Sequence, residues 1–178
     1  MTSKSRKLAG RVVFITGGAR GIGKATAKAL VAAGATVAIG DLDGELAAAT
    51  AAEIGGGTRG FVLDVADRAS FENFVAEAEA ALGPLDVLIN NAGIMPVGLF
   101  LDEDDATARR QIDVNVHGVL HGMKIALPKF VERGRGHLVN IASVAGKAGF
   151  PGVATYSGTK HFVVGVSEAA RLELRGTG

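Results

Sequence analysis

Three side chains in the second half of the chain have the types and the spacing needed to move a proton to or from an alcohol. Tyr156 and Lys160 are four residues apart, and Ser143 precedes Tyr156 by 13 residues. On a helix, residues four apart share a face, so the Lys160 ammonium can stabilise a Tyr156 phenolate. Tyr156 can then act as general acid and base, while the Ser143 hydroxyl stabilises charge that develops on the substrate oxygen. The trio predicts proton transfer at an alcohol or a carbonyl group.

A glycine-rich segment far upstream has the features of a phosphate-binding turn. Gly17, Gly21 and Gly23 lie between a β-strand pattern that ends at Thr16 and an Ala-rich helix pattern. A pyrophosphate needs bare backbone amides at a helix N-terminus, where the helix dipole favours an anion and a side chain would obstruct it. The alternative is an ordinary strand-to-helix turn. The strand before it and the helix after it favour a dinucleotide site.

The choice between NAD and NADP depends on two residues of opposite charge. Asp41 ends the second strand pattern, 18 residues beyond Gly23, where a carboxylate can accept hydrogen bonds from the adenosine ribose and repel a 2′-phosphate. Asp43 adds a second negative charge. Arg20 is the opposing signal, because its guanidinium could bind a 2′-phosphate. The balance predicts NAD as the cofactor, with NADP as the less favoured alternative.

The elements that must position these residues alternate along the chain. We predict strands at Arg11–Thr16, Thr36–Asp41, Gly60–Leu63, Asp86–Asn90 and His137–Ala142. We predict helices at Gly21–Ala33, Gly44–Ile54, Arg68–Leu82, about Glu103–Val131 and about Tyr156–Leu174. Such alternation is typical of βαβ units with right-handed crossovers. The expected fold is α/β, a doubly wound, mostly parallel Rossmann-type sheet, in one domain over residues 1–178.

Composition excludes several classes of function. The chain has 178 residues, a net charge of +1 and no cysteine, so nothing points to nucleic acid, a membrane surface, a disulfide framework or a cysteine nucleophile. No apolar segment of signal-peptide type follows the basic residues 1–7, and no apolar run is long enough to span a membrane. These features predict a cytoplasmic protein with no membrane or nucleic-acid partner.

Taken together, the motifs resemble those of the classical short-chain dehydrogenase/reductase family from Arg11 to about Leu174. No single motif is specific, but six in the same order are. The matching pieces are Thr16–Gly23, Asp64-Val65, Asn90–Gly93, Asn115, Ser143 and Tyr156-x3-Lys160.

The resemblance implies roles for residues that the spacing alone does not explain. Asn115 would support a water-mediated proton path to Lys160, and Lys160 would also hold the nicotinamide ribose. The implied catalytic set is Asn115, Ser143, Tyr156 and Lys160. The implied cofactor-binding set is Gly17, Arg20, Gly21, Ile22, Gly23, Asp41, Leu42, Asp64, Val65, Asn91, Ala92, Gly93, Tyr156 and Lys160. Asn91 is expected to be mainly structural, fixing neighbouring strand ends.

The resemblance also bears on the C-terminus and on the substrate. Family members normally continue past the helix of Tyr156 and Lys160 with further strands and a helical substrate lid, so the chain is expected to be truncated at its C-terminus. The remaining half of the substrate pocket is expected to be apolar, which suggests a hydrophobic alcohol or ketone. Its candidate wall residues are Met95, Pro96, Val97, Val144, Ala145, Phe150 and Val153. A homodimer or homotetramer is also implied.

Other interpretations stay open at this point. The chain could be a catalytically silent NAD-binding module that acts through partners, or an unrelated Rossmann protein such as a methyltransferase. Tyr156, Lys160 and Ser143 could be a helix-surface tyrosine, a solvated lysine and a capping serine. His117 and His121 have zinc-like spacing, but no third ligand accompanies them, so no metal site is expected. The acidic run at residues 102–105 is interpreted as helix capping.

Overall fold

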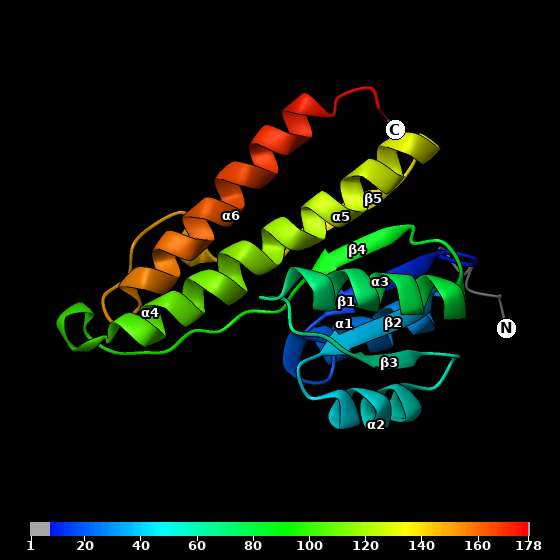
Figure 1. Ribbon diagram of the computed structural model, residues 1–178, viewed down its shortest axis with the longest axis horizontal. Helices are drawn as coiled ribbons and strands as arrows, with labels where there is room; N and C mark the ends of the chain where they lie inside the picture. The colour runs from blue at the N-terminus through cyan, green and yellow to red at the C-terminus, as the bar shows by residue number, and fades with distance from the viewer. Residues whose placement is uncertain (1–7, 178) are drawn as a thin grey trace, which may run out of the picture.

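The computed structural model describes residues 8–177, so the basic segment 1–7 lies outside the described residues. Its centre is a five-stranded, fully parallel sheet with the strand order β3-β2-β1-β4-β5 (Figure 1). The strands are β1 Val12–Thr16, β2 Thr36–Asp41, β3 Arg59–Val62, β4 Val87–Asn90 and β5 His137–Asn140. The order reverses between β1 and β4, which is the switch point where open α/β sheets bind ligands. The predicted doubly wound Rossmann-type sheet is confirmed.

Helices follow the strands as the sequence pattern predicts. They are α1 Gly21–Ala32, α2 Gly44–Ile54, α3 Arg68–Leu82, α4 Asp105–Ile112, α5 Gly118–Arg133 and α6 Ala154–Glu173. Aspartates at the N-caps define where three of them begin, because the carboxylates of Asp43, Asp67 and Asp104 each accept a hydrogen bond from a first-turn amide. The predicted bounds of β2, α2 and α3 agree with the structure to the residue.

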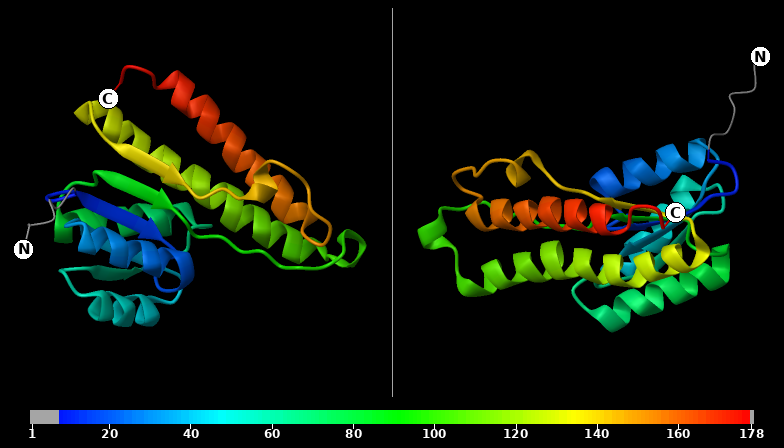
Figure 2. Two further views of the ribbon diagram at one scale, coloured as in Figure 1. Left: turned by 180° about the vertical axis from the view of Figure 1, so that it is seen from behind. Right: turned by 90° about the horizontal axis from the view of Figure 1, so that it is seen from above.

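Two apolar layers enclose the sheet. Every residue of β1 is buried, and its side chains alternate between the faces. Phe14 packs on the α3 side, where its ring centroid lies 5.7 Å from that of Phe74. Val13 and Ile15 pack on the opposite side with Ala27 of α1. Figure 2 shows α1 on one side of the sheet and α3 and α5 on the other, with α6 running alongside α5.

The prediction of one long helix from about Glu103 to Val131 is confirmed as a continuous helical run from Asp105 to Arg133, but this run is not uniform. The structure has a short 3₁₀ turn η1 at Phe100–Asp102, then α4, then a π-helical turn η2 at Asp113–His117, then α5. A π turn inserts an extra residue into the helix and changes which side chains face its neighbours. Here it lies at Asn115, a residue implicated in catalysis by resemblance.

The acidic run before α4 has mixed roles, so its interpretation as helix capping holds only in part. Asp104 is the N-cap, and its Oδ1 accepts a hydrogen bond of 2.6 Å from the Thr107 amide. Glu103 instead contacts side chains of α4 and α6. Asp102 belongs to η1 and is exposed.

Within residues 8–177, no helix is long and apolar enough to cross a bilayer. In the same range, β3 and β5 form the two edges of the sheet. The helices α5 and α6 pack together beyond the β5 edge through Val119, Met123 and Val163.

Candidate active site

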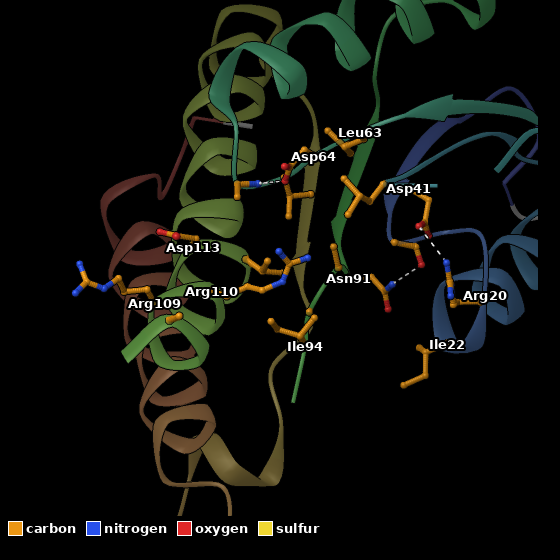
Figure 3. Close-up of a pocket in the computed structure, with 18 residues that line it drawn as sticks. Arg20, Ile22, Asp41, Leu63, Asp64, Asn91, Ile94, Arg109, Arg110 and Asp113 are labelled. Carbon is orange, nitrogen blue, oxygen red and sulfur yellow. Dashed lines mark hydrogen bonds and ion pairs between the residues drawn. The ribbon is translucent and has the colours of Figure 1, made fainter. Parts of the chain in front are cut away.

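The carboxyl ends of β1, β2, β3 and β4 open onto a cavity of about 930 Å³ (Figure 3). That volume is in the range of ligand and cofactor sites. The cavity is lined by Gly17, Arg20, Ile22, Asp41, Leu42, Leu63, Asp64, Val65, Ala66, Asn91, Ala92, Gly93, Ile94, Ala106, Arg109, Arg110, Asp113 and Val114. Ten of the residues predicted to bind the cofactor are in this set. Gly21, Gly23, Tyr156 and Lys160 are not among the lining residues.

The glycine turn leaves the start of α1 open to an anion. Gly17 and Gly21 have φ of +64° and +53°, a backbone region that favours glycine. The N-cap residue of α1, Arg20, makes no side-chain capping bond, and the first turn carries no acidic residue. The first-turn amides are therefore available to a ligand, and the helix dipole adds positive potential. This arrangement fits the pyrophosphate of a dinucleotide.

Gly23 is required for close packing rather than for its φ angle. A Cβ added there would lie 2.2 Å from the Gly17 carbonyl oxygen and 2.7 Å from the Asn91 amide nitrogen. That nitrogen donates hydrogen bonds to the carbonyl oxygens of Thr16 and Gly17, at 2.9 and 3.1 Å. The Asn91 side chain thus joins the end of β1 to the end of β4, as the structural interpretation of Asn91 expects.

Substituting Gly23 gives a testable expectation. Gly23→Ala should lower the free energy of unfolding by about 1–3 kcal/mol, because the new methyl forces the turn apart, and should remove measurable NADH binding. The control Gly165→Ala lies on α6 with open space around the new methyl, and should raise stability by about 0.5–1 kcal/mol. Thermal unfolding and NADH titration of both variants make the comparison. Equal behaviour of the two variants would contradict the packing argument.

Asp41 and Arg20 face one another at one end of the cavity (Figure 3). Asp41 Oδ2 accepts a hydrogen bond of 3.1 Å from the Ala19 amide, and Arg20 Nη2 lies 3.9 Å from Asp41 Oδ1. The same guanidinium nitrogen lies 3.9 Å from Asp43 Oδ2. Arg20, the residue that opposed the NAD prediction, is thus paired with two carboxylates.

Asp64 and Val65 line the cavity from the loop after β3. Asp64 Oδ1 accepts a hydrogen bond of 2.9 Å from the Ala66 amide, and its own amide donates to Ser70 Oγ at 3.0 Å. The Val65 carbonyl oxygen lies 3.0 Å from His121 Nδ1. His121 therefore packs against this loop, as the packing interpretation expects. No group of three metal-binding side chains occurs within the described part of the chain.

Tyr156 and Lys160 meet near the start of α6. Lys160 Nζ lies 5.6 Å from the centroid of the Tyr156 ring and donates a hydrogen bond of 2.7 Å to the Ile141 carbonyl oxygen. The lysine side chain is only 5% exposed, and this burial lowers the pKa of its ammonium. The position of the ammonium suits stabilisation of a phenolate.

Ser143 is brought to the same place by a short turn. It is the N-cap of the 3₁₀ turn η3, Val144–Gly146, and its Oγ accepts a hydrogen bond of 3.1 Å from the Ala145 amide. The capping alternative is thus correct as a structural description, and the hydroxyl hydrogen remains available as a donor. η3 packs tightly on α6, because a Cβ at Gly146 would lie 2.6 Å from the Lys160 carbonyl oxygen.

Asn115 holds the loop after β4 instead of contacting Lys160 directly. Its Oδ1 accepts from the Ile94 amide and its Nδ2 donates to the Ile94 carbonyl oxygen, each at 2.9 Å. The same Nδ2 donates to Thr159 Oγ1 at 3.2 Å. A Cβ at Gly93 would lie 3.2 Å from Asn115 Oδ1 and 3.7 Å from Lys160 Nζ. Because Gly93 has no side chain, the cavity wall comes close to the Lys160 ammonium at this point.

Sequence reasoning missed the wall that α4 and η2 provide. Ala106, Arg110, Asp113 and Val114 line the cavity, and Arg110 extends toward its centre in Figure 3. Their spacing of three or four residues was the available signal, since such residues share a helix face. A helix assignment alone does not say which of its faces lines a cavity.

The expected apolar walls are exposed in large part. Met95, Val97, Val144 and Phe150 are exposed hydrophobic side chains, and the Gly98 amide donates to the Gly152 carbonyl oxygen at 3.0 Å, which joins the two loops that carry them. Ala145 is the exception, at 3% exposed, so it belongs to the packed interior of η3.

Comparison with known proteins agrees with these features. A family model described as short chain dehydrogenase matches residues 11–178. A 2-dehydro-3-deoxy-L-rhamnonate dehydrogenase (NAD(+)) of Sphingomonas sp. is 40% identical over 176 residues, covering 97% of this chain and 69% of the relative. A 2,5-dichloro-2,5-cyclohexadiene-1,4-diol dehydrogenase of Sphingobium indicum is 42% identical over 172 residues, covering 95% and 69%. A 3-alpha-(or 20-beta)-hydroxysteroid dehydrogenase of Mycobacterium tuberculosis is 39% identical, covering 98% and 67%.

A solved structure matches closely as well. It is a short chain dehydrogenase/reductase from Burkholderia phymatum in complex with NAD, with a TM-score of 0.92 and 31% sequence identity. The match covers 97% of this chain and 63% of that one. The chain therefore spans about two thirds of the length of the proteins it matches.

Proposed function

This chain belongs to the short-chain dehydrogenase/reductase family, and from that premise we propose that it interconverts an alcohol and its carbonyl compound with NAD. The observation that carries the proposal is the Lys160 ammonium, 5.6 Å from the centre of the Tyr156 ring and buried beside Gly93 of the cavity wall. A buried ammonium next to a phenol is an arrangement suited to proton transfer.

In this mechanism Tyr156 is the general acid in the reductive direction and the general base in the oxidative direction. Its phenol gives the proton to the carbonyl oxygen of the substrate, and Lys160 stabilises the phenolate that remains. The Ser143 hydroxyl donates a hydrogen bond to the same substrate oxygen as charge develops on it. The nicotinamide supplies or accepts the hydride when it is bound. Asn115 orients the Ile94 end of the loop, and Lys160 nearby would hold the nicotinamide ribose when the cofactor is bound.

The preferred cofactor is NAD. Asp41 lines the cavity with a side chain that is 11% exposed, and Arg20 is engaged by Asp41 and Asp43. A 2′-phosphate would bring up to two negative charges next to a poorly solvated carboxylate. The name of the Sphingomonas relative and the NAD in the Burkholderia structure support the same choice.

Removing the Asp41 carboxylate should invert the preference. Asp41→Ser should shift the ratio of NADPH to NADH dissociation constants about 100-fold toward NADPH, because the repulsion from Asp41 is gone and Arg20 keeps only its contact with Asp43 as it binds the phosphate. The double variant Asp41→Ser, Arg20→Ala should lose most of the gained NADPH affinity. Fluorescence titration of both reduced cofactors measures this. A ratio that does not change in Asp41→Ser would rule out Asp41 as the selector.

The proposed substrate is a hydrophobic alcohol or ketone. Support comes from the exposed apolar side chains of the two loops beside Tyr156, including Val97, Leu99, Val144 and Phe150. The relatives are named for substrates of different polarity, a sugar acid, a chlorinated diol and a steroid. The loop composition of this chain favours the less polar end of that range.

The proposal extends to a homodimer or homotetramer in the cytoplasm. The supporting observation is that α5 and α6 lie side by side at the β5 edge and carry the exposed apolar residues Val131 and Leu172. Self-association through paired helices is a common way to cover such residues.

One experiment separates this proposal from the silent-module alternative. The 178-residue chain is titrated with NADH and then assayed for NADH oxidation with a panel of cyclic and aromatic ketones. Binding with turnover supports an oxidoreductase. Binding without turnover, even at high protein concentration and across the whole panel, favours the silent NAD-binding module.

A further inference from the structure

Glu103 makes contacts that the other acidic residues of the segment 102–105 do not make. Its Oε1 accepts a hydrogen bond from Gln111 Nε2 of α4, and its Oε2 accepts one from Thr155 Oγ1 of α6. Asp104 next to it caps α4, and Asp102 is exposed. One carboxylate therefore joins the loop before α4 to the beginning of α6, across 52 positions of sequence.

Burial makes this link more than a surface contact. Gln111 is 0% exposed, and its Oε1 is buried with no hydrogen-bond partner among residues 8–177. A buried amide is costly unless its polar atoms are paired, so the bond from Gln111 Nε2 to Glu103 matters for the packing of α4. Glu103 itself is only partly exposed. Both of its carboxylate oxygens are thus committed to buried or partly buried donors.

The beginning of α6 depends on help from elsewhere in the chain. Its N-cap residue, Val153, has no side chain that can cap, and its first turn contains no acidic residue. The Glu103 carboxylate, bonded to Thr155 in that first turn, supplies the negative charge that the helix dipole favours there. Tyr156 is the next residue. The contact that orders the start of α6 therefore lies one residue from the phenol.

The other end of this link is the apolar loop beside Tyr156. The loop is held at Ile94 by Asn115 and at Gly98 by the Gly152 carbonyl oxygen. Between these points and Glu103 lie exposed apolar side chains, with Leu99 and Phe100 at 65% and 68% exposed. Glu103 is the third attachment point of the loop. Asn115 also bonds to α6, at Thr159, but Glu103 is the one that bonds to its first turn, at Thr155.

We propose that Glu103 is a positioning residue that fixes the Tyr156 phenol and the apolar loop at residues 95–101 relative to each other. The proposal rests on the proposed role of Tyr156 in catalysis. Glu103 does not touch the reacting atoms. It acts through Thr155 on the helix end that carries the phenol, and through its own backbone on the loop that contacts the substrate.

Three variants test the proposal through steady-state kinetics. Glu103→Ala should lower kcat/KM by about 10- to 100-fold, mostly in kcat, because small displacements of a proton donor have large effects on rate. Glu103→Gln should keep activity near wild type, since its oxygen accepts from Thr155 and its amide can donate to Gln111 Oε1 once the Gln111 amide turns over. Asp102→Ala, an exposed neighbour, is the matched control and should be unchanged. NADH affinity should be the same in all three.

A second readout does not depend on activity. Tyr156 is the only tyrosine and the chain has no tryptophan, so tyrosine emission reports on this one side chain. Glu103→Ala should lower the steady-state anisotropy of this emission and raise its quenching by acrylamide, whereas Glu103→Gln and Asp102→Ala should match wild type. If wild type turns over no carbonyl compound, the proposed function fails, and the emission still decides whether Glu103 positions Tyr156.

Several results would overturn the proposal for Glu103. Glu103→Ala that matches Asp102→Ala in kcat/KM and in acrylamide quenching overturns the proposal. So does a Glu103→Ala variant that only melts earlier, with kcat and emission unchanged, because that pattern belongs to a purely structural residue. If Glu103→Ala does not fold, Thr155→Val removes the same hydrogen bond from the other side with little change in shape. It should reproduce the loss of kcat, and wild-type kcat in Thr155→Val overturns the proposal.

Discussion

Tyr156→Phe should lower kcat/KM for ketone reduction by about 100- to 10,000-fold and leave NADH affinity close to that of wild type. The substitution removes one oxygen atom and keeps the ring against which the Lys160 ammonium lies. Proton donation to the substrate oxygen is lost, while the glycine turn, Asp41 and Lys160 still bind the cofactor. Initial rates of NADH oxidation and NADH titrations on the same preparations measure both effects.

The control for this experiment lies beyond the C-terminal end of the same helix. Thr177→Ala changes a hydroxyl that bonds only to the Leu174 carbonyl oxygen at the far end of the chain, and should leave kcat/KM unchanged. Equal turnover by Tyr156→Phe and wild type would rule out Tyr156 as the general acid. A fall in NADH affinity as large as the fall in kcat/KM would assign Tyr156 to cofactor binding instead.

Lys160→Met should move activity and stability in opposite directions. Activity should fall by about 100-fold or more, because the phenolate loses its stabilising charge. The melting temperature near pH 7 should rise by about 2–4 °C, which corresponds to about 1 kcal/mol for a chain of this size. The gain arises because burial disfavours the Lys160 ammonium, as the lowered pKa of this group indicates. Loss of the hydrogen bond to Ile141 offsets part of it.

The stability of wild type relative to Lys160→Met should change with pH in one direction. Because the pKa of Lys160 is lower in the folded chain, the unfolded chain binds more protons between that lowered pKa and the ordinary pKa of lysine. Wild-type stability therefore gains with rising pH in this window, relative to Lys160→Met. The difference in melting temperature should be largest near neutral pH and shrink toward pH values of about 10. Thermal unfolding at a series of pH values measures it, with the exposed Lys124→Met as the control.

A widening difference at high pH would contradict the buried-charge argument. A Lys160→Met variant that is less stable than wild type at every pH would mean that the bond to Ile141 outweighs the cost of burying the charge. Both outcomes concern stability alone, so the loss of activity remains a separate test of the role of Lys160 in catalysis.

Much of the site follows from local sequence. The glycine turn could be predicted because it lies between the continuous apolar strand β1 and the start of α1. Its glycines are needed because Gly17 and Gly21 adopt left-handed conformations. Tyr156 and Lys160 share a face because a helix places residues four apart together wherever it lies. Asp41 reaches the cavity because parallel strands end at the same edge of a sheet. Each of these relations depends on one element or on one strand connection.

Other features depend on how distant elements pack, and tertiary structure alone decided them. The π turn at Asn115 is tied to Ile94, 21 residues away, and Glu103 reaches Thr155, 52 residues away. Arg110 lines the cavity because α4 lies along its wall. Sequence periodicity describes which side of a helix is apolar, but it contains no information on which distant donor meets a given carboxylate. That pairing is determined when the helices pack onto the sheet and onto each other, because buried polar groups must then have hydrogen-bond partners within reach.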